Sequence, residues 1–331
     1  MRRANSVRCV TCVIGTVLFS AAFLPSVEAQ SVRYPTKPVR VILPFSAGGP
    51  IEAPARSVTQ KLTEAFGQAF AFDYRTGASG SIGTEIVARA PRDGYTMLIT
   101  NCAHTQNAAY YKKLPYDPVD DFAAISQLDV TYGNLLVVHP SVPVHSLKEF
   151  VALAKSRPGA LKYASAGIGS PPHVTAALFA TMSGIDLLHV PYKGTSVAFN
   201  DVLGGHVEAM TVHHVTGLQY VQTGRLRALG LGGPRRHPLF PQIPTFDEFG
   251  LKGFDVTCYH GAWFPAGTPG EIVTLMNAQI VKALATPEVR KAIDDAGYIP
   301  VGNTPQEFTD FNRKDVARQK EILKLIGLEP Q

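Results

Sequence analysis

The sequence predicts an α/β protein built from two lobes of similar construction. Short apolar runs of strand length alternate with helix-length segments from residue 39 to 100, and the alternation restarts between residues 134 and 231. A stretch rich in proline and aspartate, residues 111–121, precedes the second series. Alternating strands and helices are typical of parallel β-α-β units with right-handed crossovers. The length of 331 residues, with 45% hydrophobic and 17% charged residues, suits two packed lobes and excludes general disorder.

The first 29 residues have the pattern of an export signal. Three arginines, at positions 2, 3 and 8, precede an apolar stretch over residues 10–24, and the small-x-small pattern Val27-Glu28-Ala29 follows. This order predicts a secretory signal peptide that is cleaved after Ala29, so that the mature chain begins at Gln30. The alternative is an N-terminal membrane anchor, for which this apolar stretch is short.

The elements of the two series follow from their residue patterns. Strands are predicted where short runs are rich in apolar, β-branched and aromatic residues, and helices where longer segments follow glycine turns or capping residues. In the first series these are strands at 39–45, 69–74 and 95–100, and helices at 54–66 and 82–90. In the second series they are strands at 134–139, 161–165, 187–191, 207–212 and 226–231, and helices at 147–156, 173–183 and 196–203, with a helical stretch through residue 220.

The C-terminal part is predicted to contain one further strand, which could cross back between the lobes, and two helices. After a loop at 232–244, a strand at 254–264 is followed by a helix at 270–284, with a continuation from Pro287. The last helix begins at Thr304-Pro305-Gln306-Glu307, which combines a capping box with proline at the first helical position. The domain organisation that we expect is residues 1–29 as signal peptide, 30–130 as the first part of lobe 1, 131–252 as lobe 2, and 253–331 as a segment that returns to lobe 1 if the strand at 254–264 crosses back.

The charge pattern excludes one class of partner. Without residues 1–29 the chain keeps 28 Lys and Arg against 25 Asp and Glu, and these basic residues are dispersed. A nucleic-acid partner is therefore not expected.

No catalytic or metal-binding pattern emerges. The Gly-x-Ser-x-Gly and His-Glu-x-x-His patterns are absent, and the adjacent His213 and His214 would point to opposite faces of a strand. We therefore expect no enzymatic activity, no metal and no cofactor. The mature chain has two cysteines, Cys102 and Cys258, for which the sequence leaves open a disulfide or two small buried thiols.

Three loops at predicted strand ends are rich in glycine and small hydroxyl residues. They span residues 44–49, 77–83 and 164–171. Such loops can aim backbone N–H groups at an anion beside the positive end of a helix. Because ligands of open α/β sheets bind at the carboxyl ends of the strands, the three loops together predict a shared cleft for a carboxylate or a phosphate. The spacing G-x-x-G-x-x-G differs from the dinucleotide fingerprint, and no P-loop is present, so a nucleotide is not expected.

At these loops the sequence resembles the periplasmic solute receptors of tripartite tricarboxylate transporters, the Bordetella uptake gene (Bug) family. The resemblance covers essentially the whole mature chain. Its motifs stand here, in order, as Pro44-Phe45-Ser46-Ala47-Gly48-Gly49, Gly77-Ala78-Ser79-Gly80-Ser81-Ile82-Gly83, Pro91-Arg92-Asp93-Gly94-Tyr95-Thr96, Tyr111-Lys112-Lys113-Leu114-Pro115-Tyr116-Asp117, Gly169-Ser170-Pro171-Pro172-His173, His189-Val190-Pro191-Tyr192-Lys193-Gly194, Pro244-Thr245-Phe246 and Pro265-Ala266-Gly267-Thr268-Pro269.

The resemblance implies a two-lobed periplasmic binding protein of type II, a Venus flytrap with two interlobe crossings and C-terminal helices packed largely on the first lobe. It also implies that the ligand carboxylate sits between the first two glycine loops, partly through water, while loops of the second lobe close over its other end. The ligand contacts carried over from the family are Phe45, Ser46, Ala47, Gly48, Gly49, Gly77, Ala78, Gly80, Ser81 and His104 in the first lobe, and Ser165, Gly169, Ser170, His173 and Tyr192 in the second. From the sequence alone, His104 and His173 are equally well explained as structural hydrogen-bonding residues.

The sequence departs from the family pattern at four positions. Glu52 stands where relatives usually carry Asp, Pro54 where they usually carry isoleucine or a similar residue, and Thr76 where proline is frequent. Val212 stands near the position where many relatives present an Asp to a ligand amino group, and His213, which follows it, is a further candidate contact. The missing acid favours a di- or tricarboxylate or an aromatic carboxylate over an amino acid.

The function that the resemblance implies is a monomeric periplasmic receptor. It would capture a small carboxylate and hand it to the membrane subunits of a tripartite tricarboxylate transporter. The alternatives are a ligand sensor that presents the bound carboxylate to a membrane sensor kinase, and an exported enzyme on the same scaffold.

Overall fold

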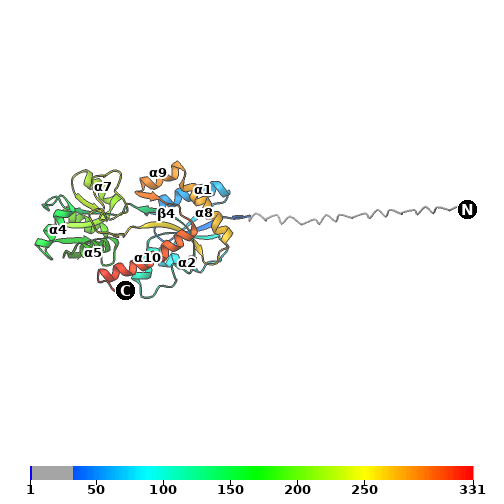
Figure 1. The fold of residues 1–331 in the computed structure, drawn as a ribbon, viewed down its shortest axis with the longest axis horizontal. Coiled ribbons are helices and arrows are strands. Elements are labelled where there is room, and N and C mark those ends of the chain that lie inside the picture. Colours follow the sequence, from blue (N-terminus) through cyan, green and yellow to red (C-terminus); the bar gives the residue numbers. More distant parts are fainter. Residues whose placement is uncertain (2–32, 331) are drawn as a thin grey trace. The chain divides into compact units, whose positions relative to one another are not determined.

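The computed structural model describes Met1 and residues 33–330, which form two sheets, each covered by helices on both faces (Figure 1). The predicted signal peptide, with its cleavage after Ala29, lies outside the described residues. Among the helices of the described part, none is long and apolar enough to cross a membrane.

The first sheet has six strands in the order β11-β4-β10-β3-β1-β2. Strands β1, β2 and β3 pair in parallel, while β10 and β11 pair antiparallel with their neighbours. The strands are β1 (Val39–Leu43), β2 (Phe70–Tyr74), β3 (Thr96–Asn101), β4 (Phe122–Thr131), β10 (Tyr259–Pro265) and β11 (Tyr298–Pro300).

Two apolar cores hold helices on the faces of this sheet. One core joins it to α1 (Glu52–Phe66), α8 (Gly270–Leu284) and α9 (Pro287–Asp295). The other includes side chains of α2 (Ser81–Ala88) and α10 (Pro305–Leu325), and Cys102 at the start of α3 (Ala103–Tyr110). The parallel part of the sheet is thus covered on both faces, as its apolar strands require.

The second sheet has five strands in the order β7-β6-β8-β5-β9. Its strands are β5 (Asn134–Val138), β6 (Lys162–Ser165), β7 (Leu188–Pro191), β8 (Ala209–His213) and β9 (Arg227–Leu231). Its helices are α4 (Leu147–Ser156), α5 (Pro171–Ser183), α6 (Thr195–Leu203) and α7 (His214–Gln222). Helices α4 and α5 share one core and α6 contributes to another, so this sheet is also covered on both faces.

Three elements were not predicted from the sequence: β4, α3 and the short β11. Strand β4 carries buried polar side chains whose partners lie far away in the sequence. Ser126 donates a hydrogen bond to the carbonyl oxygen of Asn303 over 2.9 Å, and Asp129 accepts one from Nδ1 of His260 over 3.0 Å. A local apolar pattern could not reveal this strand, because these polar groups are satisfied only in the folded protein.

The chain passes between the sheets twice, and the two crossings touch. The first runs from β4 to β5 through Gly133, and the second covers residues 232–258 between β9 and β10. The N–H of Gly232 donates to the carbonyl oxygen of Asn134 over 2.8 Å. A Cβ atom on Gly133 would lie 2.5 Å from the carbonyl oxygen of Gly232, and Gly133 has a positive φ of 96°. Glycine is therefore required where the two backbones meet.

The last helix lies against elements of both sheets. Its capping box is confirmed: the N–H of Glu307 donates to Thr304 Oγ1 over 3.2 Å, and the N–H of Thr304 donates to the Glu307 carboxylate over 2.9 Å. Helix α10 contacts α3 and β4 on the first sheet's side and also α5, which belongs to the second.

Candidate ligand-binding site

A cavity of about 480 Å³ lies where the three glycine loops meet. Its volume is in the range of pockets that hold small molecules. The first two loops contribute Phe45 and Ser79, and the third contributes Ile168, Gly169, Ser170 and Pro171. The remaining lining residues come from the end of β3, from α3 and the residues that flank it, from the segment just before β10, and from the end of α10 with the tail that follows it: Asn101, Cys102, Ala103, Gln106, Asn107, Tyr110, Tyr111, Cys258, Leu323, Leu328 and Glu329.

The first glycine loop, residues 44–49, is held by the carboxylate of Glu52, the first residue of α1. The N–H of Gly48 donates to the Glu52 carboxylate over 2.6 Å. The hydrogen bond from Arg56, together with that from Gly48, lowers the pKa of Glu52 to about 2. Of this loop only Phe45 lines the cavity. Ser46, Ala47, Gly48 and Gly49, also predicted as ligand contacts, lie outside the lining.

The second glycine loop offers backbone donors that no protein group uses. Ala78 and Ser79 have positive φ angles of 44° and 51°. Their N–H groups have no acceptor among the described residues, whereas the N–H of Gly80 donates to the carbonyl oxygen of Gly77 over 2.9 Å. Helix α2 begins directly after them, at Ser81. Adjacent free N–H groups in a turn beside a helix N-terminus form a concavity suited to an anion.

Side chains of α3 and of Tyr111, which follows it, hold this second loop in place. The Asn107 side-chain amide donates to the carbonyl oxygen of Ser79 over 3.1 Å, and the Tyr111 hydroxyl donates to Ser79 Oγ over 3.4 Å. Sequence reasoning did not select Ser79, Asn107 or the other cavity residues of α3, since α3 itself was not predicted. Gly77, Ala78, Gly80 and Ser81 flank the cavity without lining it.

The loops approach each other closely at Gly80. A Cβ atom there would lie 3.1 Å from Cζ of Phe45, and the φ angle of Gly80 is +87°. Glycine at this position lets the Phe45 ring pack against the second loop, which places that ring in the cavity wall.

The third glycine loop uses most of its donors internally. The N–H groups of Gly167, Gly169 and Ser170 donate to Ser165 Oγ, His173 Nδ1 and the carbonyl oxygen of Gly167, over 3.1, 3.1 and 3.2 Å. Helix α5 then begins with two prolines, which have no N–H. This loop lines the cavity but presents few free backbone donors to it.

The predicted residues behind this loop support it from the far side. Ser165 is buried, and its Oγ lies 2.7 Å from Nε2 of His189. The His173 ring stacks on His189 at a centroid distance of 4.1 Å, and burial lowers the pKa of His173 to about 4. The hydroxyl of Tyr192 donates to Asp201 over 2.6 Å. None of these three predicted residues lines the cavity.

His104 and His213, also predicted as ligand contacts, lie outside the lining of this cavity. His104 is only 1% exposed, and its ring packs against Trp263 with a centroid distance of 4.4 Å. Its Nε2 lies 2.7 Å from the carbonyl oxygen of Pro118. Half-buried His213 is the last residue of β8, the central strand of the second sheet, and lies beside His214 and beside Tyr298 of β11. Both rings are accommodated as packing groups, and burial lowers the pKa of each to about 4.

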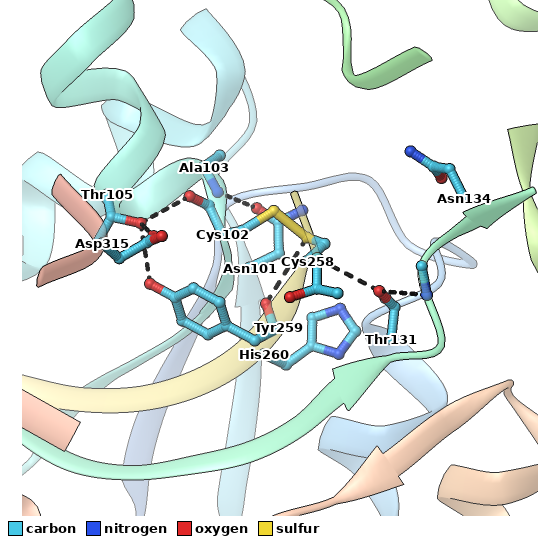
Figure 2. The surroundings of a disulfide bond; sticks show 12 residues. Asn101, Cys102, Ala103, Thr105, Thr131, Asn134, Cys258, Tyr259, His260 and Asp315 are labelled. Atoms are coloured by element: carbon cyan, nitrogen blue, oxygen red, sulfur yellow. Dashed lines mark hydrogen bonds between the residues drawn. A yellow bond between two sulfur atoms is a disulfide. The ribbon is translucent and has the colours of Figure 1, made fainter. Parts of the chain in front are cut away.

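A disulfide forms part of the cavity wall. Cys102, at the start of α3, and Cys258, just before β10, are joined by a bond of 2.07 Å (Figure 2). The alternative of two free thiols is therefore not the arrangement in this structure. The backbone around Cys258 is fixed by Thr131, whose N–H donates to the Cys258 carbonyl oxygen over 2.8 Å. The disulfide thus joins the start of α3, in the cavity wall, to the segment where the second crossing enters the first sheet.

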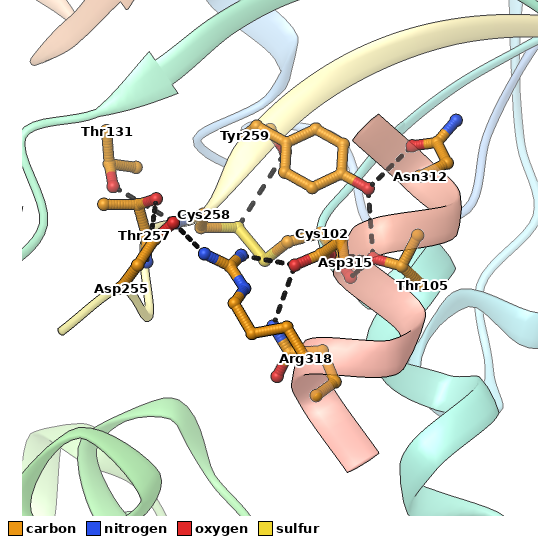
Figure 3. A network of polar contacts seen from close by, with 11 residues as sticks. Cys102, Thr105, Thr131, Asp255, Thr257, Cys258, Tyr259, Asn312, Asp315 and Arg318 are labelled. Atoms are coloured by element: carbon orange, nitrogen blue, oxygen red, sulfur yellow. Dashed lines mark hydrogen bonds and ion pairs between the residues drawn. A yellow bond between two sulfur atoms is a disulfide. The ribbon is translucent and has the colours of Figure 1, made fainter. Parts of the chain in front are cut away.

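A polar network next to the disulfide links α10 to the second crossing (Figure 3). Arg318 of α10 pairs with Asp255 of the crossing and with buried Asp315 of its own helix. Thr105 of α3 donates to the Asp315 carboxylate over 2.5 Å. Burial lowers the pKa of Arg318 to about 10. The network ties α10 to α3 and to the second crossing, next to the cavity.

Comparison with known proteins assigns this arrangement to a family. The family model of the tripartite tricarboxylate transporter family receptor matches residues 54–328. The UPF0065 protein in the tcbD-tcbE intergenic region of a Pseudomonas species is 35% identical over 300 residues, which is 90% of this chain and 89% of that protein.

Two solved structures agree. Rpa4515 of R. palustris, solved with adipate, has a TM-score of 0.75 and 31% identity and covers 90% of this chain and 100% of its own. The periplasmic binding protein BugD has a TM-score of 0.71 and 32% identity, over 90% of this chain and 100% of its own. The chain therefore belongs to the family of tripartite tricarboxylate transporter receptors, the Bug or TctC-like periplasmic solute-binding proteins, and has their two-lobed fold.

Proposed function

We propose that this protein captures a small carboxylate in the periplasm and delivers it to the membrane subunits of a tripartite tricarboxylate transporter. The observation that carries the proposal is the pair of free N–H groups at Ala78 and Ser79, next to the start of α2, where Ser79 lines the cavity and Ala78 flanks it. A carboxylate bound there would accept both hydrogen bonds and face the positive end of the helix.

The proposed contacts come from loops on both the first-sheet side and the second-sheet side of the cavity. Phe45, Ser79, Gly169 and Ser170 lie on the cavity wall and would touch the ligand. Gly77, Gly80 and Ser81 would shape the loop that holds its carboxylate. Closure of the second lobe over the first would then enclose the ligand, and the closed form would be the one that the transporter recognises.

The remaining parts of the proposal concern processing and assembly. The chain would be exported, cleaved after Ala29, and act as a monomer, with lobe 1 formed by residues 30–130 and 253–331 and lobe 2 by residues 131–252. Adipate is bound by a relative that covers nearly the whole chain, which supports a carboxylate ligand without fixing its class.

The test is a thermal-shift screen of residues 30–331, refolded after unfolding to remove any co-purified ligand. The panel contains di- and tricarboxylates, aromatic and aliphatic monocarboxylates, inorganic phosphate and acidic amino acids. A ligand at 100 times its Kd stabilises the native state by about 2.7 kcal/mol, which gives a clear rise in the midpoint. A shift with carboxylates and none with phosphate supports the proposal. A folded protein that responds to phosphate alone, or to no carboxylate, would refute it.

A further inference from the structure

The cavity wall carries no positive charge for a second carboxylate. Among the described residues that line it, none is lysine, arginine or histidine. The charged side chain that does line it is Glu329, which is exposed in the tail after α10. A ligand with two carboxylates would place the second one near a like charge, which is unfavourable even where water screens it.

Backbone donors are also scarce on the wall opposite the second glycine loop. There the N–H groups of Gly167, Gly169 and Ser170 are bonded within the third loop, and Pro171 and Pro172 have none, which leaves the N–H of Ile168 as the free donor of this stretch. A second carboxylate at this wall would lose water without gaining a full set of partners, which costs binding free energy. The paired free donors at Ala78 and Ser79 suit one carboxylate.

The rest of the wall suits an apolar ligand body. Phe45 and Ile168 come from opposite loops, Tyr110 comes from α3, and Leu323 and Leu328 come from α10 and its tail. The disulfide adds a further apolar surface. Contact with such groups stabilises a hydrocarbon chain or ring in proportion to the apolar area it buries.

These features point to one ligand class. We infer that the site selects a monocarboxylate with an apolar body, such as a benzoate or a hexanoate, over the corresponding dicarboxylate. We also infer that Glu329 contributes to this selection by disfavouring a second carboxylate. The inference rests on the proposed function, because it assumes that the ligand's carboxylate binds at the second glycine loop.

The test compares ligands that differ by one carboxylate. Isothermal titration of residues 30–331 would measure Kd for benzoate and terephthalate, and for hexanoate and adipate. The monocarboxylate of each pair is expected to bind at least about tenfold more tightly, since the second carboxylate would lack a positively charged partner and a full set of hydrogen bonds.

A charge reversal tests the part played by Glu329. Glu329→Lys is expected to lower the ratio of the terephthalate Kd to the benzoate Kd by about twofold to fivefold, the size of an exposed ion pair. The matched control is Glu321→Lys, an exposed glutamate of α10 outside the cavity wall, which should leave the ratio unchanged.

The outcomes separate this inference from the proposed function. If no carboxylate binds to the folded protein, the proposed function falls and the inference falls with it. If terephthalate and adipate bind as tightly as their partners or more tightly, the receptor role stands and the inference is overturned. If Glu329→Lys and Glu321→Lys change the ratio equally, the selective role of Glu329 is refuted.

Discussion

Cys102 and Cys258 are bonded across 156 residues of sequence, and the loop that they close contains every strand of the second sheet. A crosslink that closes so long a loop restricts the unfolded chain strongly.

The double substitution Cys102→Ser with Cys258→Ser is therefore expected to lower the free energy of unfolding by about 2–5 kcal/mol. Urea denaturation followed by circular dichroism would measure the change. Dithiothreitol should lower the midpoint of the native protein and leave that of the double variant unmoved. Equal midpoints for the two proteins under oxidising conditions would contradict the prediction.

Gly80→Ala is expected to weaken carboxylate binding as well as stability. The new methyl group would meet the Phe45 ring at 3.1 Å, and a φ of +87° is strained for alanine. Gly67→Ala is the matched control, because its φ is +66° and its methyl group would have no heavy atom within 4 Å. Both variants should lose about 1–2 kcal/mol of stability. Calorimetric titration should show a loss of affinity in Gly80→Ala alone, and equal affinities would argue against the placement of the site.

Acid is expected to destabilise the protein between pH 6.5 and pH 4. The pKa of His104 and that of His213 are lowered to about 4 in the folded protein by burial, whereas an unperturbed histidine titrates near 6.5. Within this window the unfolded chain binds more protons, so stability is complete above pH 6.5 and falls as pH falls. Within this window each such histidine lowers the free energy of unfolding by up to about 1.4 kcal/mol for every unit that the pH falls.

Urea titrations at several pH values would measure this slope. His104→Gln should reduce it, while His145→Gln, at an exposed position, should not. A slope that is the same in all three proteins would show that His104 does not carry the effect.

Arg318→Met is expected to destabilise the protein far more than Asp255→Asn. Removing Arg318 leaves the carboxylate of Asp315, whose side chain is 1% exposed, without its ion pair, which costs about 3–5 kcal/mol. The side chain of Asp255 is 44% exposed, so water can replace its partner and the loss should stay below about 1 kcal/mol. Chemical denaturation of the two variants gives the comparison, and losses of similar size would contradict it.

Local patterns were sufficient to predict the elements whose physical causes are local. The alternation of strands and helices, the three glycine loops and the capping box at Thr304 all depend on neighbouring residues. Helix α3 was missed because the residue at its N-cap, Cys102, makes no capping hydrogen bond through its side chain and gives no capping signal in the sequence. Strand β4 was missed because its polar residues depend on Asn303 and His260.

The candidate site shows the same division. The sequence directed attention to Phe45, Gly169 and Ser170, which line the cavity. It also directed attention to His104, whose ring the fold places beside Trp263 instead. No local pattern distinguishes a cleft histidine from a core histidine, since the difference lies in residues that are far away in sequence. The part of the wall formed by Leu328 and Glu329 depends on the packing of α10 against α5 and likewise leaves no local signal.

Because the two crossings touch at Gly133 and Gly232, the chain enters the second sheet and leaves it at nearly the same point. A segment with joined ends can be exchanged between relatives as a cassette, because one short junction preserves the geometry on both sides. Recombination at this junction would give chimaeras that keep the carboxylate loop of one parent and acquire the opposite cavity wall of another. Ligand range in this family could then change by swapping a whole half of the protein, without any new substitution in the loop that holds the carboxylate.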